Sequence, residues 1–204
     1  MRVFVTGGTG VLGRAAIPRL LEEGHEVRAP GRVELDLFDP VAVAGAVRAA
    51  DAVLHLATRI PQLARRGEPG AWDENDRLRA EASRLLVDAA LDAGSELYVQ
   101  ASVTFVERPG ARPQWSALVA ERETARFAAA GRRGVVLRFG LLDGPGTDYP
   151  EPNPALGATV HVDDAGRALA AALSVASGIY AVCRDGESVS NAEFKEASGW
   201  SPRR

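Results

Sequence analysis

The sequence predicts an α/β fold built on a doubly wound parallel sheet with helices on both faces. Short runs rich in β-branched residues alternate with longer amphipathic segments, which is the pattern of parallel strands joined by crossover helices. A glycine-rich turn follows the first of these runs, and two later segments are rich in proline and glycine. Open sheets of this kind bind ligands in the loops at the carboxyl ends of their strands, so we expect the functional site there.

The first half of the chain alternates strand and helix. Arg2 to Thr6 is a nearly continuous apolar strand, and the helix from Val11 to Glu23 ends at Gly24 in the usual C′ position. The same patterns predict strands at Glu26 to Ala29, Val33 to Leu35 and Ala52 to Leu56, and a helix from about Pro40 to Ala50. Proline is tolerated at the start of that helix because the first turn has no partner for its N–H.

The second half contains the most clearly periodic helix, from Asn75 to Ala93, whose apolar residues form one stripe before Gly94 ends it. The remaining predicted elements are strands at Glu96 to Ala101, Val135 to Phe139, Val160 to Val162 and Ile179 to Cys183, and helices at Trp115 to Ala130 and Asp163 to Ala176. The two Pro/Gly-rich loops span Arg59 to Gly70 and Gly144 to Gly157.

Composition limits the classes of protein to which the chain can belong. With 204 residues and 46% hydrophobic content, we expect one domain over residues 1–204, with a small C-terminal lobe from about residue 140. A net charge of −3, with 24 basic residues scattered among 27 acidic ones, argues against a nucleic-acid partner. The single cysteine, Cys183, excludes an internal disulfide. Because the first strand begins at residue 2 and no apolar run reaches membrane-spanning length, we expect a cytoplasmic protein with no membrane partner.

The glycine-rich turn has the sequence VTGGTGVLG, with glycines at positions 7, 10 and 13 between a predicted strand and a predicted helix. Gly7, Gly10 and Gly13 would allow a sharp turn, close approach of a pyrophosphate to the backbone, and close packing of helix on strand. The N-terminus of the helix would direct N–H groups and a partial positive charge at the phosphates. The pattern predicts a dinucleotide site in a Rossmann-type domain, and the alternative is a tight turn without a ligand.

Several segments resemble, in the same order, the NAD-dependent epimerase/dehydratase family of extended short-chain dehydrogenases. They are TGGTGVLGR, DAVLHLAT, LLVDAALDAG after Asn75, YVQASVTFV, VVLRFGLLDGPGT and HVDDAGRAL. The resemblance implies that the three glycines line the pyrophosphate and that Val11 and Leu12 lie at the helix start beside it. It further implies that Asp36 and Leu37 flank the adenine, and that Leu56, Ala57 and Thr58 pass along the adenosine ribose and phosphates.

The residues after the second strand favour NADP as the cofactor, with NAD as the alternative. Gly31 occupies the position where an acidic residue would bind the ribose 2′-OH, and Arg32, which follows it, would pair with a 2′-phosphate. Arg14, just after the third glycine, adds positive charge nearby. The alternative for Arg32 is an ordinary solvated loop residue.

The catalytic pattern of the family is broken. Members carry Ser or Thr after the fourth long strand, then a Tyr that exchanges a proton with the substrate and a Lys four residues later that lowers the pKa of the phenol. Ser102 fits the first position, whereas Trp115 and Val119 align with the Tyr and the Lys. Indole and valine cannot replace those groups. No Tyr-x-x-x-Lys occurs anywhere, because the only lysine is Lys195 and none of the three tyrosines lies four residues before it.

Substitute proton donors are few. Ser102 is either a substrate contact or an ordinary strand-end hydroxyl, and Tyr149, with Asp148, lies in the loop expected to cover the cleft. Trp115 is either a core aromatic or a stacking partner for the nicotinamide. We expect His55, in an apolar strand, to be a hydrogen-bonded core histidine.

His161, Asp163 and Asp164 superficially resemble a metal cluster. The segment HVDD also resembles the family's structural turn at a helix start, so we expect Asp163 as the N-cap and no metal site. Only 21 residues separate Phe139 from His161, where relatives place much of their substrate lobe, so this lobe is reduced.

Two functions remain open. The first is an atypical oxidoreductase, or an epimerase/dehydratase homologue, that acts on a small molecule without the Tyr/Lys pair. The second is a non-catalytic dinucleotide-binding protein that senses redox state or serves as a scaffold. The helices that begin at Asn75 and Trp115 could form a homodimer interface, or could instead pack only on the sheet.

Overall fold

The computed structural model describes residues 1–106, 114–153, 155, 157–186 and 188–204. Its main sheet has six strands in the order β2-β1-β3-β4-β5-β8, and every neighbouring pair is parallel. The strands are β1 (Arg2–Thr6), β2 (Glu26–Arg28), β3 (Ala52–His55), β4 (Leu97–Val103), β5 (Arg133–Phe139) and β8 (Gly178–Val182). The chain starts at β1, adds β2 on one side and then β3, β4, β5 and β8 on the other. The predicted doubly wound parallel sheet is therefore confirmed.

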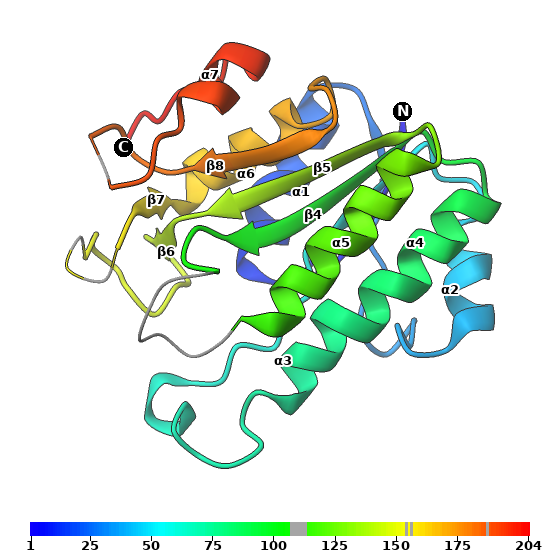
Figure 1. The fold of residues 1–204 in the computed structure, drawn as a ribbon, viewed down its shortest axis with the longest axis horizontal. Helices are drawn as coiled ribbons and strands as arrows, with labels where there is room; N and C mark the ends of the chain where they lie inside the picture. The colour runs from blue at the N-terminus through cyan, green and yellow to red at the C-terminus, as the bar shows by residue number, and fades with distance from the viewer. Residues whose placement is uncertain (107–113, 154, 156, 187) are drawn as a thin grey trace.

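Helices cover both faces of this sheet (Figure 1). One face carries α1 (Val11–Glu22) and α6 (Val162–Ala171), and the other carries α2 (Pro40–Val47), α4 (Ser83–Asp92) and α5 (Trp115–Ala129). On the first face, α1 and α6 approach so closely that a Cβ on Gly166 would lie 2.5 Å from the carbonyl oxygen of Ala15. Glycine at that position is thus required by the packing of the two helices.

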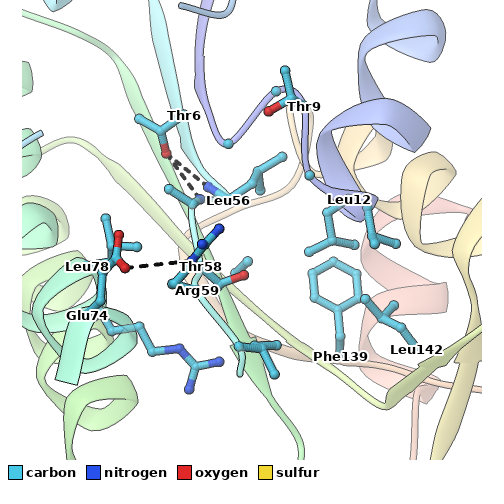
Figure 2. A pocket seen from close by; sticks show the side chains of 18 of the residues that line it. Thr6, Thr9, Leu12, Leu56, Thr58, Arg59, Glu74, Leu78, Phe139 and Leu142 are labelled. Atoms are coloured by element: carbon cyan, nitrogen blue, oxygen red, sulfur yellow. Dashed lines mark hydrogen bonds and ion pairs between the residues drawn. The ribbon is translucent and has the colours of Figure 1, made fainter. Parts of the chain in front are cut away.

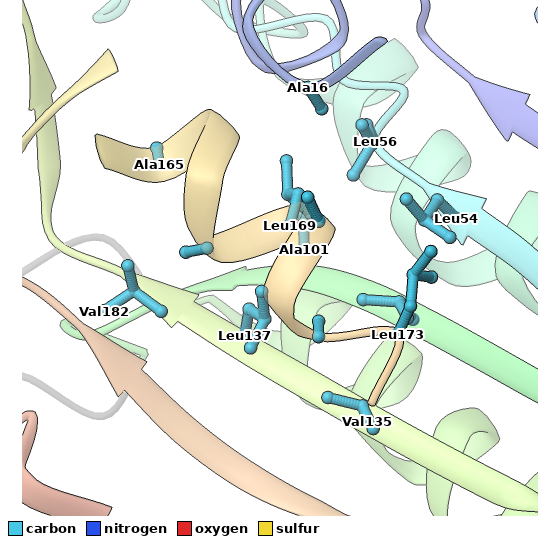
Figure 3. Packing of buried hydrophobic residues seen from close by; sticks show 14 of the residues in the cluster. Ala16, Leu54, Leu56, Ala101, Val135, Leu137, Ala165, Leu169, Leu173 and Val182 are labelled. Atoms are coloured by element: carbon cyan, nitrogen blue, oxygen red, sulfur yellow. The ribbon is translucent and has the colours of Figure 1, made fainter. Parts of the chain in front are cut away.

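The two cores differ in composition. Figure 3 shows the core under α1 and α6, where Leu54 and Leu137 of the sheet meet Leu169 of α6. The core on the opposite face is more aromatic, because Tyr98 of β4 packs on Phe127 of α5 with ring centroids 5.8 Å apart. These buried contacts hold the carboxyl ends of the strands in place, and the site lies at those ends.

The C-terminal third adds structure outside the main sheet. Short parallel strands β6 (Leu141–Asp143) and β7 (Thr159–His161) form a two-stranded sheet, which Arg184 fastens by ion pairing with Asp143 and donating to Thr159 Oγ1. Helix α7 (Ala192–Ser198) packs through Phe194, whose ring lies 5.7 Å from that of Tyr180 and 5.5 Å from that of Trp200.

Several predicted elements need correction. Val33–Leu35 is a turn and not a strand, because Val33 is fully exposed and the turn is closed by Leu35 N–H donating to the Gly31 carbonyl. The helix predicted from Asn75 is α3 (Asp73–Arg77), a π-helical turn at Leu78–Ala82, and α4. The strand near residue 160 pairs with β6 and not with the main sheet, and the following helix ends at Ala171. Strand β6 and helix α7 were not predicted, because each is short and weakly patterned.

None of the helices in the described part of the chain is both long and apolar enough to span a membrane.

Candidate functional site

A cleft of about 990 Å³ opens at the carboxyl ends of β1, β3, β4 and β5, the position predicted from the sequence. Figure 2 shows part of its wall, with Leu12 and Phe139 on one side and Thr58, Arg59 and Glu74 on the other. The predicted site residues that line the cleft are Gly7, Gly10, Val11, Leu12, Arg32, Asp36, Leu37, Leu56, Ala57, Thr58, Ser102 and Tyr149. Gly13 lies beneath the turn and does not line the cleft.

The three glycines of the turn differ in the space around them. Gly7 has φ +72°, and a Cβ there would lie 2.7 Å from the backbone nitrogen of Ala57. A Cβ on Gly13 would lie 2.4–2.6 Å from backbone atoms of Gly7 and Gly8, so Gly13 serves the packing of helix on strand. Gly10 is the N-cap of α1, and a Cβ there would meet only the Gly7 carbonyl oxygen, at 3.1 Å. The space beside Gly10 is therefore open toward the cleft.

A buried polar network joins the two strands on which the turn rests. Thr6, at the end of β1, donates its hydroxyl proton to His55 Nδ1 across 2.7 Å and accepts the N–H groups of Leu56 and Ala57. The other ring nitrogen of His55 donates to the Leu78 carbonyl oxygen across 3.0 Å. Burial lowers the pKa of His55 from 6.5 to about 4, so the ring is neutral at pH 7. The prediction of a hydrogen-bonded core histidine is confirmed.

The π-helical turn that begins at Leu78 is part of this network, because its first carbonyl accepts from His55. The same turn places Arg79 in the cleft wall, with the guanidinium donating to Gln114 Oε1 across 3.0 Å. Single π turns within α-helices are frequent at functional sites. The sequence pattern of this helix did not identify Arg79 as a cleft residue. Its position in the wall depends on the π turn and on the contact with Gln114.

Charged side chains surround the end of the cleft where the adenosine is expected. Glu74 pairs with Arg32 (3.1 Å) and Arg59 (3.6 Å), so one carboxylate holds two arginines from different loops. The Arg77 guanidinium lies 4.0 Å from the ring centroid of Phe38, a cation–π contact beside the same wall. Arg32 thus lines the cleft and is paired with Glu74, while its predicted contact with a 2′-phosphate stays a prediction.

Ser102 lies at the other end of the cleft, where β4 ends. Its hydroxyl donates to Glu121 Oε1 of α5 across 2.6 Å. Arg138 of β5 donates to both oxygens of that carboxylate, at 2.9 Å and 2.6 Å. Ser102 and Glu121 are buried, at 4% and 6% exposure, and the partly exposed guanidinium of Arg138 completes a hydrogen-bonded triad with them.

Helix α5 contributes none of its described residues to the cleft wall. Trp115, aligned with the family tyrosine, is 51% exposed at the first turn, so it is neither a core aromatic nor part of the cleft. Val119 is half-buried outside the cleft. Lys195 lies on α7 and pairs with Asp185 at 3.0 Å. Neither Trp115 nor Val119 therefore supplies the chemistry of the family's Tyr and Lys, and Lys195 lies outside the cleft on α7.

The two Pro/Gly-rich loops meet over the cleft. Arg66 of the first loop forms an ion pair with Asp148 of the second, and both residues line the cleft. Tyr149 lies beside them and is half-buried, with its carbonyl accepting from Gly144 N–H at 2.9 Å and from Thr147 Oγ1 at 2.8 Å. Its role as a proton donor stays a prediction. Tyr98 is unsuitable, because it is fully buried and burial raises the pKa of its phenol.

The turn at the start of α6 differs from the prediction in one respect. His161 and not Asp163 is the N-cap, because its Nδ1 accepts the Asp163 N–H at 3.2 Å. Asp163 instead lies in the first helical turn, where its negative charge interacts favourably with the helix dipole. Asp164 is buried and binds Arg167 together with the backbone N–H groups of Arg203 and Arg204. Among the residues that the structure describes, no group of three or more His, Cys, Asp or Glu side chains could hold a metal ion.

Comparisons with known proteins agree with this geometry. Residues 3–156 match the NAD dependent epimerase/dehydratase family. The chain is 36% identical, over an alignment of 233 positions, to the 3-diazoavenalumate denitrifying reductase of a Streptomyces species, and the alignment covers 91% of this chain and 76% of the relative.

Two solved structures share the fold. RMD from Pseudomonas aeruginosa, complexed with NADPH, has a TM-score of 0.80 at 19% identity and covers 100% of this chain and 95% of its own. The UDP-glucose 4-epimerase of Thermus thermophilus, in complex with NAD, has a TM-score of 0.72 at 25% identity, over 100% and 85% of the two chains. Proteins of the family use NAD(P). The sheet order, the glycine turn and the match over most of the chain show that this protein belongs to the NAD dependent epimerase/dehydratase family.

Proposed function

We propose that the protein is an NADP(H)-dependent reductase that delivers hydride to a small electrophile which needs no proton from a tyrosine. The observation that carries the proposal is one continuous cleft that runs from the glycine turn to Ser102, while α5 adds none of its described residues to the wall. At the cofactor end, the glycine turn between β1 and α1 supports a dinucleotide site like that of the family. The substrate end lacks the family's proton donor.

The residues present fit a nicotinamide dinucleotide. The space above Gly10 and the backbone of the turn would receive the pyrophosphate, and Leu12 and Leu56 would cover its sides. Asp36 and Leu37 would lie beside the adenosine, and Arg32 would pair with a 2′-phosphate, which favours NADPH over NADH. When bound in its reduced form, this cofactor supplies a hydride.

The missing Tyr/Lys pair limits the electrophiles that the protein could reduce. Reduction of a carbonyl places negative charge on oxygen and requires a proton, which the tyrosine provides in typical relatives. A cationic nitrogen electrophile does not have this requirement. Replacement of an aryl diazonium group by hydride balances as ArN₂⁺ + H⁻ → ArH + N₂, with no proton taken from the protein. The name of the Streptomyces relative, a diazo-compound denitrifying reductase, supports an acceptor of this class.

A two-stage experiment tests the proposal. Titration of the protein with NADPH and NADH, followed by fluorescence, measures binding, and we expect NADPH to bind more tightly. Stopped-flow loss of NADPH absorbance is then recorded with aryl diazonium salts, aldehydes, ketones and sugar nucleotides. The expected result is oxidation by the cationic acceptors alone, above the rate with Gly10→Val, which controls for the uncatalysed reaction. Turnover of carbonyl compounds only, or absence of NADP(H) binding, would contradict the proposal.

A non-catalytic dinucleotide-binding protein is the second candidate. It is favoured by the same observation that none of the described residues of α5 lines the cleft. Under this alternative, NADPH or NADP⁺ binds tightly while no acceptor in the panel is reduced, and Ser102→Ala leaves every measured quantity unchanged.

A further inference from the structure

The hydroxyl proton of Ser102 is already used within the protein. A serine has one O–H to donate, and Ser102 donates it to Glu121 Oε1 across 2.6 Å. Arg138 donates two further hydrogen bonds to the same carboxylate, so the Glu121 oxygens accept in all three contacts. Ser102 lines the cleft, and toward the cleft it can therefore offer only oxygen lone pairs.

This arrangement determines which substrate atom can lie against Ser102. A carbonyl oxygen is also an acceptor, so it would face the Ser102 oxygen with no proton between them, at the cost of an unpaired polar group. An N–H or O–H group has the opposite polarity and completes a hydrogen bond. Ser102 thus favours a donor where a typical relative binds an acceptor.

The cleft also has apolar side chains in its wall. Phe105, Phe139 and Leu142 line it, whereas Arg66 and Asp148, which line it too, are paired with each other. The Arg79 guanidinium, also in the wall, donates to Gln114. An apolar ring that carries one donor group suits these surroundings.

We infer that Ser102 is a specificity-determining residue which accepts a hydrogen bond from the N–H of a protonated imine. The inference rests on the proposed reductase function and adds protonated imines to the aryl diazonium ions as cationic nitrogen electrophiles that the cleft would accept. The reaction balances without a proton from the protein. Hydride adds to the carbon of C=N–H⁺, the π electron pair becomes the nitrogen lone pair, and the proton stays on nitrogen while Ser102 holds it.

A matched pair of ligands tests the inference without turnover. Tetrahydroisoquinoline, protonated at pH 7, carries N–H donors at the ring position where isochroman carries an ether oxygen, and the two are otherwise similar in shape. Calorimetry on the protein, with and without NADP⁺, measures both dissociation constants. We expect tetrahydroisoquinoline to bind about tenfold more tightly, the usual effect of one charge-assisted hydrogen bond.

Two serine variants assign this preference to its residue. Ser102→Ala should remove it, whereas Ser116→Ala should retain it. Ser116 is a matched control because its buried hydroxyl also donates to a carboxylate, that of Asp76 across 2.7 Å, but it lies outside the cleft. Equal binding of the two ligands to the unaltered protein, no binding of either ligand, or a preference that persists in Ser102→Ala, would overturn the inference.

Turnover gives an independent measurement. With NADPH, 3,4-dihydroisoquinoline should be reduced and the ketone 1-tetralone should not. The double variant Glu121→Leu/Arg138→Met removes the acceptor of the Ser102 proton and frees it, so this variant should lose at least about tenfold of the imine rate. If NADPH is never oxidised while the ligand preference holds, the reductase function fails and the polarity of Ser102 stands. Reduction of 1-tetralone faster than the imine refutes the assigned substrate class.

Discussion

The two ends of the cleft differ in whether backbone or side-chain atoms form most of the site. At the cofactor end, the cleft is formed by backbone atoms of the glycine turn and the N-terminus of α1, and the side chains of Thr6 and His55 join β1 to β3 beneath them. At the substrate end, side chains dominate, and the triad of Ser102, Glu121 and Arg138 occupies the junction of β4, α5 and β5. Backbone geometry tolerates sequence change around it, whereas side-chain chemistry is altered by a single substitution. This contrast explains how a family member can keep its nucleotide site and lose its proton donor.

The largest effect is expected at the substrate end, from Arg138→Met. Removing the guanidinium leaves Glu121 buried and unpaired, which should lower the free energy of unfolding by about 3 kcal/mol. Urea denaturation measures it. The double variant Glu121→Leu/Arg138→Met removes both charges and should recover most of the loss. If Arg138→Met alone costs nothing, the triad does not hold this end of the cleft.

The His55 network should make the cofactor end sensitive to acid. Folded His55 has a pKa of about 4 against 6.5 for an unperturbed histidine, so between these values the unfolded chain binds a proton that the folded protein does not. The stability contribution is complete above about pH 6.5 and is lost as pH falls toward 4, by on the order of 3 kcal/mol.

Unfolding by urea at several pH values measures the slope of the free energy of unfolding against pH. His55→Gln should flatten it between pH 4 and 6.5, whereas Thr6→Ser, which keeps the hydroxyl partner, should retain it. An unchanged slope in His55→Gln would show that other groups cause the acid sensitivity.

Two glycine variants should separate nucleotide binding from folding. Gly10→Val fills the space above the turn and should weaken NADPH binding by roughly two orders of magnitude, about 2.7 kcal/mol. The variant should still fold, with a modest loss of stability, because its Cβ would lie 3.1 Å from the Gly7 carbonyl oxygen. Gly13→Ala should instead destabilise the fold by about 1–3 kcal/mol, because its Cβ would overlap the backbone of Gly7 and Gly8. Normal NADPH binding by Gly10→Val would mean that the pyrophosphate lies elsewhere.

The smallest expected effects concern the choice between NADPH and NADH. Arg32→Ala should weaken NADPH binding about fivefold to tenfold and leave NADH unchanged, since it removes one exposed partner of the 2′-phosphate. Glu74→Gln should have the opposite sign, because Glu74 competes for the same guanidinium. Equal effects on both nucleotides in the fluorescence titration would contradict the assignment of Arg32.

Local patterns were sufficient for much of the fold and for the cofactor end. Alternation of strand and helix predicted the parallel sheet, and spacing of the glycines placed the turn at a strand end, because both depend on residues close together in the chain. The absence of Tyr-x-x-x-Lys also follows from sequence alone. The errors came at two kinds of place. Val33–Leu35 is a short segment that does not pair with a neighbouring strand, and the N-cap of α6 is His161, two residues before the predicted Asp163.

Only the tertiary structure decided what the polar side chains do. From the sequence, Ser102 was either a substrate contact or a strand-end hydroxyl, and the fold shows that its proton goes to Glu121, 19 residues away, which Arg138 holds in turn. Likewise, Arg32 is paired with Glu74 and Trp115 is turned to solvent. Hydrogen-bond direction and burial depend on partners brought together by the packing of separate elements, and no local pattern encodes those partners.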